Sequence, residues 1–128
     1  MQVALVEKQP GLFVAKLGKE YNFATIIYPK VNVSRFVQIG EGAIIYPGVI
    51  LTVNTKIGNH VIISRNCGIG HDTAIGDYSS VLWGSNFSGY DIVEEGCFIG
   101  VGTKVIQGID INKENKISAG ITVLEDIM

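Results

Sequence analysis

The chain has 128 residues and a mass of 13.8 kDa, which suits one domain with a buried core. Its net charge is −2 and its pI is about 5.6, so the sequence offers no basic surface for nucleic acid or an anionic membrane, and we expect neither partner. We identify no apolar run of roughly twenty residues and no signal peptide, and we therefore expect a cytoplasmic protein.

Residues 1–26 precede any clear repeat. They contain an apolar segment at 3–6, a Pro10-Gly11 turn and a stretch over 12–19 that could form a short helix. We interpret them as an N-terminal extension that resembles the end of another domain, a possible remnant of a substrate-binding α/β domain. The repeat domain is expected over residues 27–128.

From Val33 onward the sequence repeats every six residues. Every sixth residue is apolar: Val33, Ile39, Ile45, Leu51, Ile57, Ile63, Ile69, Ile75, Val81, Phe87, Val93, Ile99, Val105, Ile111, Ile117 and Val123. The residue four places later is usually small or apolar, as at Ala43, Thr55, Cys67 and Ser79. Both positions face the same side of a strand, so both point inward. The pattern is typical of a parallel β-helix, an all-β fold.

Three hexapeptides make one triangular coil of eighteen residues, so residues 33–122 predict five coils. Residues eighteen apart then stack at one strand spacing, about 4.8 Å. Asp91 and Asn115 fall at inward positions, and because a buried carboxylate is costly we expect a local bulge or loop at both. Cys67 and Cys97 are thirty residues apart, which places them on different faces as buried thiols without a disulfide.

The corner residues, two places after each repeat position, form three columns. The first is solvated and contains Glu41, Asn59, Asp77, Glu95 and Lys113. The second is apolar except for one arginine and contains Pro47, Arg65, Trp83, Val101 and Ala119. The third contains Arg35, Val53, His71, Gly89 and Gln107. The third column thus places a histidine directly beside a glycine of the next coil.

His71 is the candidate general base. A neutral imidazole can accept a proton from a nucleophile, and Asp72 could hold it in one tautomer. The backbone N–H of Gly89 could stabilise an oxyanion, and Ser64 could add a hydroxyl. The simpler interpretation, a solvated turn histidine beside a glycine that relieves the backbone, stays open.

Other conspicuous side chains have structural interpretations. His60 lacks a glycine one coil later, where Tyr78 stands instead. Trp83 is expected to pack against a neighbouring subunit. The chain ends five residues after Val123, so a partner, a domain swap or a further tail is expected to cover the edge of the last coil.

The repeat, the segment from Ile69 to Asp77 (IGHDTAIGD), Ser88-Gly89 and the segment from Cys97 to Gly100 (CFIG) together resemble the sugar acetyltransferases of the left-handed β-helix superfamily. The sialic-acid and bacillosamine-type enzymes are the most similar subgroup, and residues 23–29 resemble its entry into the β-helix. In that subgroup a histidine is usual where Tyr28 stands.

The resemblance implies left-handed coils, a homotrimer with active sites at subunit boundaries, acetyl-CoA as the acyl donor and a sugar or nucleotide-sugar acceptor. His71 and Asp72 would be the catalytic residues, and the Gly89 amide would hold the acetyl carbonyl. Val101 and Ala119 would pack against acetyl-CoA. Ser64, in place of a usual asparagine, would contact substrate.

The resemblance also has limits. The subgroup usually carries an N-terminal nucleotide-sugar domain and a Gly-x-Pro-Ala loop after the last coil. A catalytically idle trimeric binding or scaffold module is therefore the alternative to a sugar N- or O-acetyltransferase. A zinc carbonic anhydrase is a third possibility, but such a site typically needs three histidines and the chain has two; no metal is expected.

Overall fold

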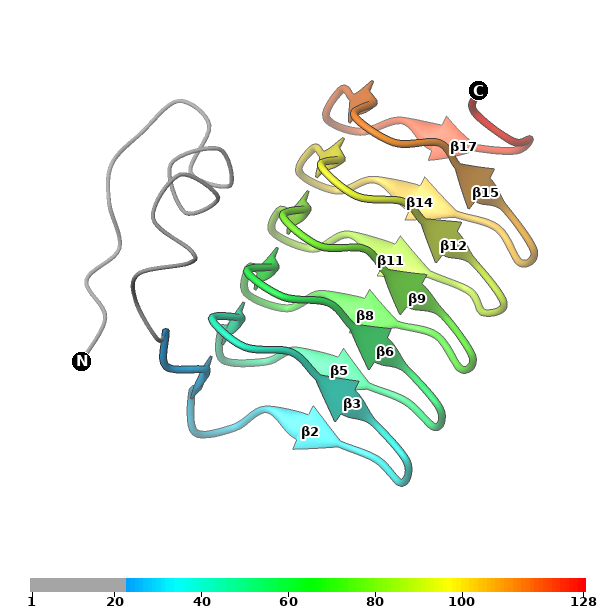
Figure 1. The fold of residues 1–128 in the computed structure, drawn as a ribbon. Coiled ribbons are helices and arrows are strands. Elements are labelled where there is room, and N and C mark those ends of the chain that lie inside the picture. The colour runs from blue at the N-terminus through cyan, green and yellow to red at the C-terminus, as the bar shows by residue number, and fades with distance from the viewer. Residues whose placement is uncertain (1–22) are drawn as a thin grey trace.

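The computed structural model describes residues 23–128, which form a parallel β-helix with three flat faces (Figure 1). The residues described contain no helix, and thus none long and apolar enough to cross a membrane. The predicted helix at 12–19 and all but the last four residues of the predicted N-terminal extension lie outside the described residues. Strand β1 spans Ile26–Ile27 and pairs with β4.

Three sheets run the length of the molecule, and each strand pairs in parallel with the strand of the next coil. The β1 sheet contains β1, β4 (Ile44–Ile45), β7 (Ile62–Ile63), β10 (Ser80–Val81), β13 (Phe98–Ile99) and β16 (Lys116–Ile117). The β2 sheet contains β2 (Asn32–Val33), β5 (Ile50–Leu51), β8 (Gly68–Ile69), β11 (Asn86–Phe87), β14 (Lys104–Val105) and β17 (Thr122–Val123). The β3 sheet contains β3 (Gln38–Ile39), β6 (Lys56–Ile57), β9 (Ala74–Ile75), β12 (Ile92–Val93) and β15 (Asp110–Ile111).

The register confirms the eighteen-residue coil. Ile45 pairs with Ile63, and Val81 pairs with Ile99. The second residue of each strand from β4 to β17 is buried and the first is not, so the repeat positions fill a continuous apolar core. The predicted all-β fold of about five coils is confirmed, and the coils are those of a left-handed β-helix.

Three rows of corners join the sheets. The Trp83 corner row links the β1 and β2 sheets, the His71 corner row links the β2 and β3 sheets, and the Asp77 corner row links the β3 and β1 sheets. In almost every corner, the residue three places after the repeat position has a positive φ. That residue is often glycine or asparagine, which adopt this conformation at low cost.

The bulge or loop predicted at Asp91 and Asn115 is wrong. Strand β12 pairs with β9 and β15, and β13 with β16, without an inserted residue. Asp91 is instead fully buried, and its carboxylate accepts backbone hydrogen bonds. The side-chain Nδ2 of Asn115 donates to the backbone oxygen of Asn112 at 2.9 Å. Hydrogen bonding to the backbone offsets part of the cost of burying these polar groups.

The predicted buried thiols are confirmed, because Cys67 and Cys97 are both free and buried. At the C-terminal end, Ile127 pairs in parallel with Ile111 and packs partly buried against the core. The Ile127 amide donates to Asp110 O at 2.9 Å, and Asn112 N donates to Ile127 O at 2.8 Å. The chain itself therefore covers part of the edge for which a partner, swap or tail was expected.

Candidate active site

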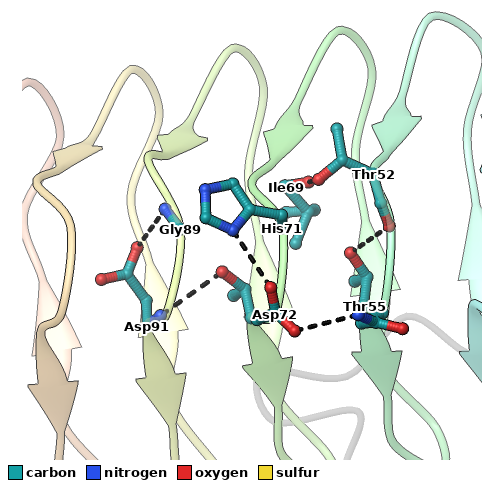
Figure 2. Close-up of polar contacts among 9 residues, drawn as sticks. Thr52, Thr55, Ile69, His71, Asp72, Gly89 and Asp91 are labelled. Atoms are coloured by element: carbon teal, nitrogen blue, oxygen red, sulfur yellow. Dashed lines mark hydrogen bonds and ion pairs between the residues drawn. The ribbon is translucent and has the colours of Figure 1, made fainter.

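His71 and Asp72 occupy one corner between β8 and β9, and their side chains are in contact (Figure 2). The distance from His71 Nδ1 to Asp72 Oδ2 is 3.1 Å, and both side chains are partly exposed to solvent. Asp72 has a φ of 57°, a left-handed conformation that aspartate tolerates better than most residues. This corner lets two adjacent residues face one another and leaves the other imidazole nitrogen, Nε2, free of Asp72.

Asn54, one coil earlier in the same corner row, holds the second oxygen of Asp72. Its Nδ2 donates to Asp72 Oδ1 at 3.1 Å. The carboxylate is thus fixed from both sides, by His71 through one oxygen and by Asn54 through the other. The sequence analysis did not identify Asn54, although its place eighteen residues before Asp72 is a signal that could have revealed it.

Gly89, one coil after His71, lies against the imidazole (Figure 2). A Cβ atom added to Gly89 would stand 2.8 Å from His71 Nε2 and 3.0 Å from Cε1, closer than real Cβ contacts. Gly89 also has a φ of 140°, which favours glycine. The site therefore requires glycine here for two separate reasons, space and backbone conformation.

The Gly89 amide has a partner in this structure. It donates to Asp91 Oδ2 at 3.3 Å, at the weak end of the hydrogen-bond range, while Ile109 N donates to Asp91 Oδ1 at 2.8 Å. Burial raises the pKa of the Asp91 carboxyl, and the backbone hydrogen bonds oppose that shift. The group expected to hold an acetyl carbonyl is therefore engaged with a buried carboxylate that the sequence analysis assigned no role.

Tyr90 forms one wall of the site. Its ring meets the His71 ring edge to face, with centroids 4.9 Å apart and planes at 90°, and it remains 55% exposed. The imidazole is thus bordered by an aromatic ring, a glycine backbone and a carboxylate, with its outer side open to solvent.

Three further predicted site residues lie elsewhere on the chain. Ser64, Val101 and Ala119 all belong to the Trp83 corner row, so one chain does not bring them to His71. Ser64 is buried, whereas Val101 is 48% exposed and Ala119 is exposed. Beside them, Gly102 and Gly120 have open space where a Cβ would project.

The remaining candidates have structural contacts. His60 stacks on Tyr78 with centroids 5.4 Å apart, as its column position predicts, and meets Phe23 edge to face. Trp83 is 54% exposed, with the Arg65 guanidinium 5.9 Å from the ring centroid. Within residues 23–128, no three side chains of His, Cys, Asp or Glu are grouped as a metal site.

No family model matches the chain. GDP-perosamine N-acetyltransferase of Escherichia coli O157:H7 is 36% identical over 96 residues, which are 75% of this chain and 43% of the relative.

Solved structures agree with the sequence relative. PerB from Caulobacter crescentus, in complex with CoA and GDP-perosamine, is similar with a TM-score of 0.88 and 30% identity, over 91% of this chain and 59% of that one. WeeI from Acinetobacter baumannii AYE is similar with a TM-score of 0.85 and 26% identity, over 91% and 57% of the two chains. The chain spans about half the length of these relatives. With its repeat, fold and relatives taken together, the chain belongs to the hexapeptide-repeat β-helix acetyltransferase superfamily, which includes sugar acetyltransferases.

Proposed function

We propose that the chain transfers an acetyl group from acetyl-CoA to an amino or hydroxyl group of a nucleotide-linked sugar. The observation that carries the proposal is the His71–Asp72 pair in contact with the Gly89 backbone. Relatives named as GDP-perosamine N-acetyltransferases support the substrate class, and a complex of one of them with CoA and GDP-perosamine supports the donor and acceptor.

His71 is the proposed general base. Its Nε2 is the nitrogen not bound to Asp72, and it lies beside Gly89 on a side chain that is 41% exposed to solvent. There it takes the proton of the acceptor as the acceptor nitrogen or oxygen attacks the acetyl carbonyl. When the carbon–sulfur bond breaks, the same proton passes to the sulfur, and CoA leaves as the thiol.

Asp72 is the proposed orienting group for that base. A carboxylate on Nδ1 favours the tautomer in which Nδ1 carries the proton and Nε2 is the acceptor. It also stabilises the imidazolium formed after proton transfer. Asn54 fixes the carboxylate from the coil below, so the imidazole keeps one orientation.

The Gly89 amide is the proposed donor to the developing oxyanion. Because its bond to Asp91 is 3.3 Å long, at the weak end of the range, the Gly89 N–H can be shared with an oxygen presented from the solvent side. Glycine at this place also keeps the backbone accessible beside Nε2.

The acyl donor is proposed to lie along the Trp83 corner row. Exposed Val101 and Ala119 offer an apolar surface there, and the open space beside Gly102 and Gly120 suits a narrow chain such as pantetheine. Ser64 is the proposed substrate contact on the same row. Since this row is separate from the His71 row in one chain, the complete site requires a second copy.

A homotrimer meets that requirement. In a closed ring of three, the Trp83 row of one copy faces the His71 row of the next, which joins the donor surface to the base at each boundary. The exposed ring of Trp83 and the apolar side chains around it supply surface for such contact. A cytoplasmic location fits the two free cysteines, Cys67 and Cys97.

The direct test is an acetylation assay. The purified chain is incubated with acetyl-CoA and a panel of nucleotide amino sugars that includes GDP-perosamine, while free CoA thiol and acetylated sugar are measured. We expect equal amounts of both products. Binding of acetyl-CoA without product from any acceptor would support the scaffold alternative instead.

A further inference from the structure

Asp91 is a buried carboxylate in a core whose other inward positions hold mainly apolar or hydroxyl side chains. It is 0% exposed, and no salt bridge reaches it within residues 23–128. Burying a carboxylate costs several kcal/mol even after relaxation, and two backbone hydrogen bonds offset only part of that. Equivalent inward positions hold Val49 and Val61, so an apolar residue would fit the core at lower cost.

The corner that Asp91 closes differs from its neighbours. In the corners before Thr55, Ser79, Ser85 and Thr103, the amide of that residue donates to the carbonyl three places earlier at 3.3 Å. The Asp91 amide donates instead to Thr73 Oγ1 at 3.4 Å, as the Cys97 amide does to Ser79 Oγ at 3.1 Å, so the distinguishing feature is the backbone at Gly89. Gly89 has a positive φ one place earlier in the hexapeptide than the other positive-φ glycines described.

The Asp91 side chain accepts the hydrogen bonds that hold this irregular corner in place. Its Oδ2 accepts from Gly89 N, and its Oδ1 accepts from Ile109 N in the following coil (Figure 2 shows the Gly89 contact). The carboxylate thus connects the irregular backbone at Gly89 to the following coil at Ile109 by hydrogen bonds. A valine in its place would let the corner relax toward the regular turn.

The altered corner lies against the proposed base. The backbone of Gly89 is the surface on which the His71 ring rests, and the His71 carbonyl accepts a hydrogen bond from Tyr90 N at 2.8 Å. Relaxation of the corner would therefore move both Gly89 and Tyr90, the two neighbours of the imidazole in the next coil.

We propose that Asp91 is a positioning residue for acetyl transfer: its buried carboxylate holds the Gly89 corner in the shape that seats His71. The inference rests on the proposed function. Asp91 itself touches neither the imidazole nor the solvent, so it acts through Gly89.

The test compares Asp91→Val, Asp91→Asn and a matched control, Asn115→Val, which replaces another inward polar residue in the Asp77 corner row, away from His71. In Asp91→Val we expect kcat/KM to fall on the order of 10²-fold, because misplacement of a base by about 1 Å has that effect. Thermal unfolding should show at most a modest change, because removal of a costly buried carboxylate opposes the loss of the acceptor for Ile109 N. Asp91→Asn keeps one acceptor oxygen and should recover part of the activity, and Asn115→Val should keep wild-type kcat/KM.

A second measurement does not depend on turnover. The chain has two histidines, so the ring resonances of His71 can be assigned by NMR with a His60 variant. We expect them to shift in Asp91→Val and to stay in place in Asn115→Val. If the wild-type chain acetylates no acceptor but these resonances shift, the positioning role stands and the proposed function fails.

A folded Asp91→Val chain with wild-type kinetics and unmoved His71 resonances would overturn the inference. Should Asp91→Val not fold, Asp91→Asn decides by the same two measurements. In that case, wild-type kinetics with unmoved resonances overturns the inference, and reduced kcat/KM with shifted resonances supports it.

Discussion

Gly89 and His71 are in contact across two successive coils, so close that a methyl group on Gly89 would stand 2.8 Å from His71 Nε2. The contact joins two parts of the proposed reaction within one chain, a base and a backbone donor. It also makes the site unusually sensitive to one small substitution.

Gly89→Ala should lower turnover on the order of 10²-fold, because the new methyl displaces the imidazole. Left-handed strain alone costs about 1 kcal/mol. Gly96→Ala is the matched control: its φ is also positive, at 69°, but its nearest neighbour is the flexible Glu114 side chain at 3.3 Å. Steady-state kinetics and thermal unfolding of both variants separate displacement from strain. Equal kinetics in the two variants would contradict the proposed seating of His71.

His71→Ala should lower turnover by roughly two to four orders of magnitude, as expected for loss of a general base. The fold should persist, since the side chain is partly exposed and outside the core. Kinetics measured beside acetyl-CoA titration calorimetry provide the check. Unchanged turnover with intact donor binding would remove His71 from the mechanism.

Asn54→Ala should lower turnover up to about tenfold, because loss of one hydrogen bond of about 1 kcal/mol frees the Asp72 carboxylate. Glu114→Ala is the control, since Glu114 has the same φ of 60° as Asn54 but lies in the Asp77 corner row, away from both proposed surfaces. A pH–rate profile of both variants is the measurement. The profile should change in Asn54→Ala alone, and parallel changes in both variants would indicate a merely structural effect.

His60 should make stability depend on pH. Burial lowers the pKa of His60 from 6.5, and the charges of Glu41 and Asp77 partly oppose this. The unfolded chain then binds the proton more tightly than the folded chain, so the contribution of His60 to stability is complete above pH 6.5 and is lost as pH falls below it. Thermal unfolding from pH 7.5 to 5 is the measurement. His60→Asn, which tolerates the positive φ, should show a weaker decline toward acid.

Trp83→Glu should shift the proposed trimer toward monomers, because a buried, unpaired carboxylate would replace an apolar contact. Sedimentation equilibrium is the measurement, with Glu95→Ala in the solvated Asp77 corner row as the control. If the wild-type chain is a trimer, loss of acetyl transfer should accompany dissociation, since His71 and Val101 lie on different rows of one chain. A trimer that survives Trp83→Glu would place the interface elsewhere.

Much of the fold follows from the sequence because the repeat is local and regular. A six-residue period with apolar residues at one inward place and small ones at the other can fill only a narrow prism, so coil length, register and the inward faces of residues such as Ile63 and Ile99 were predictable. The contact of His71 with Gly89 was predictable for the same reason, since stacking converts a spacing of eighteen residues into contact.

Only the tertiary structure shows the contacts of residues that the six-residue pattern does not describe. Asp91 breaks the inward pattern, and the sequence suggested a bulge; only the folded chain shows backbone amides from two coils meeting its carboxylate. Ser64 is near His71 in sequence, but a triangular coil places them on different corner rows. Periodicity determines which side of a strand a residue faces, whereas hydrogen bonds between coils depend on backbone angles and distances that appear only when the coils are stacked.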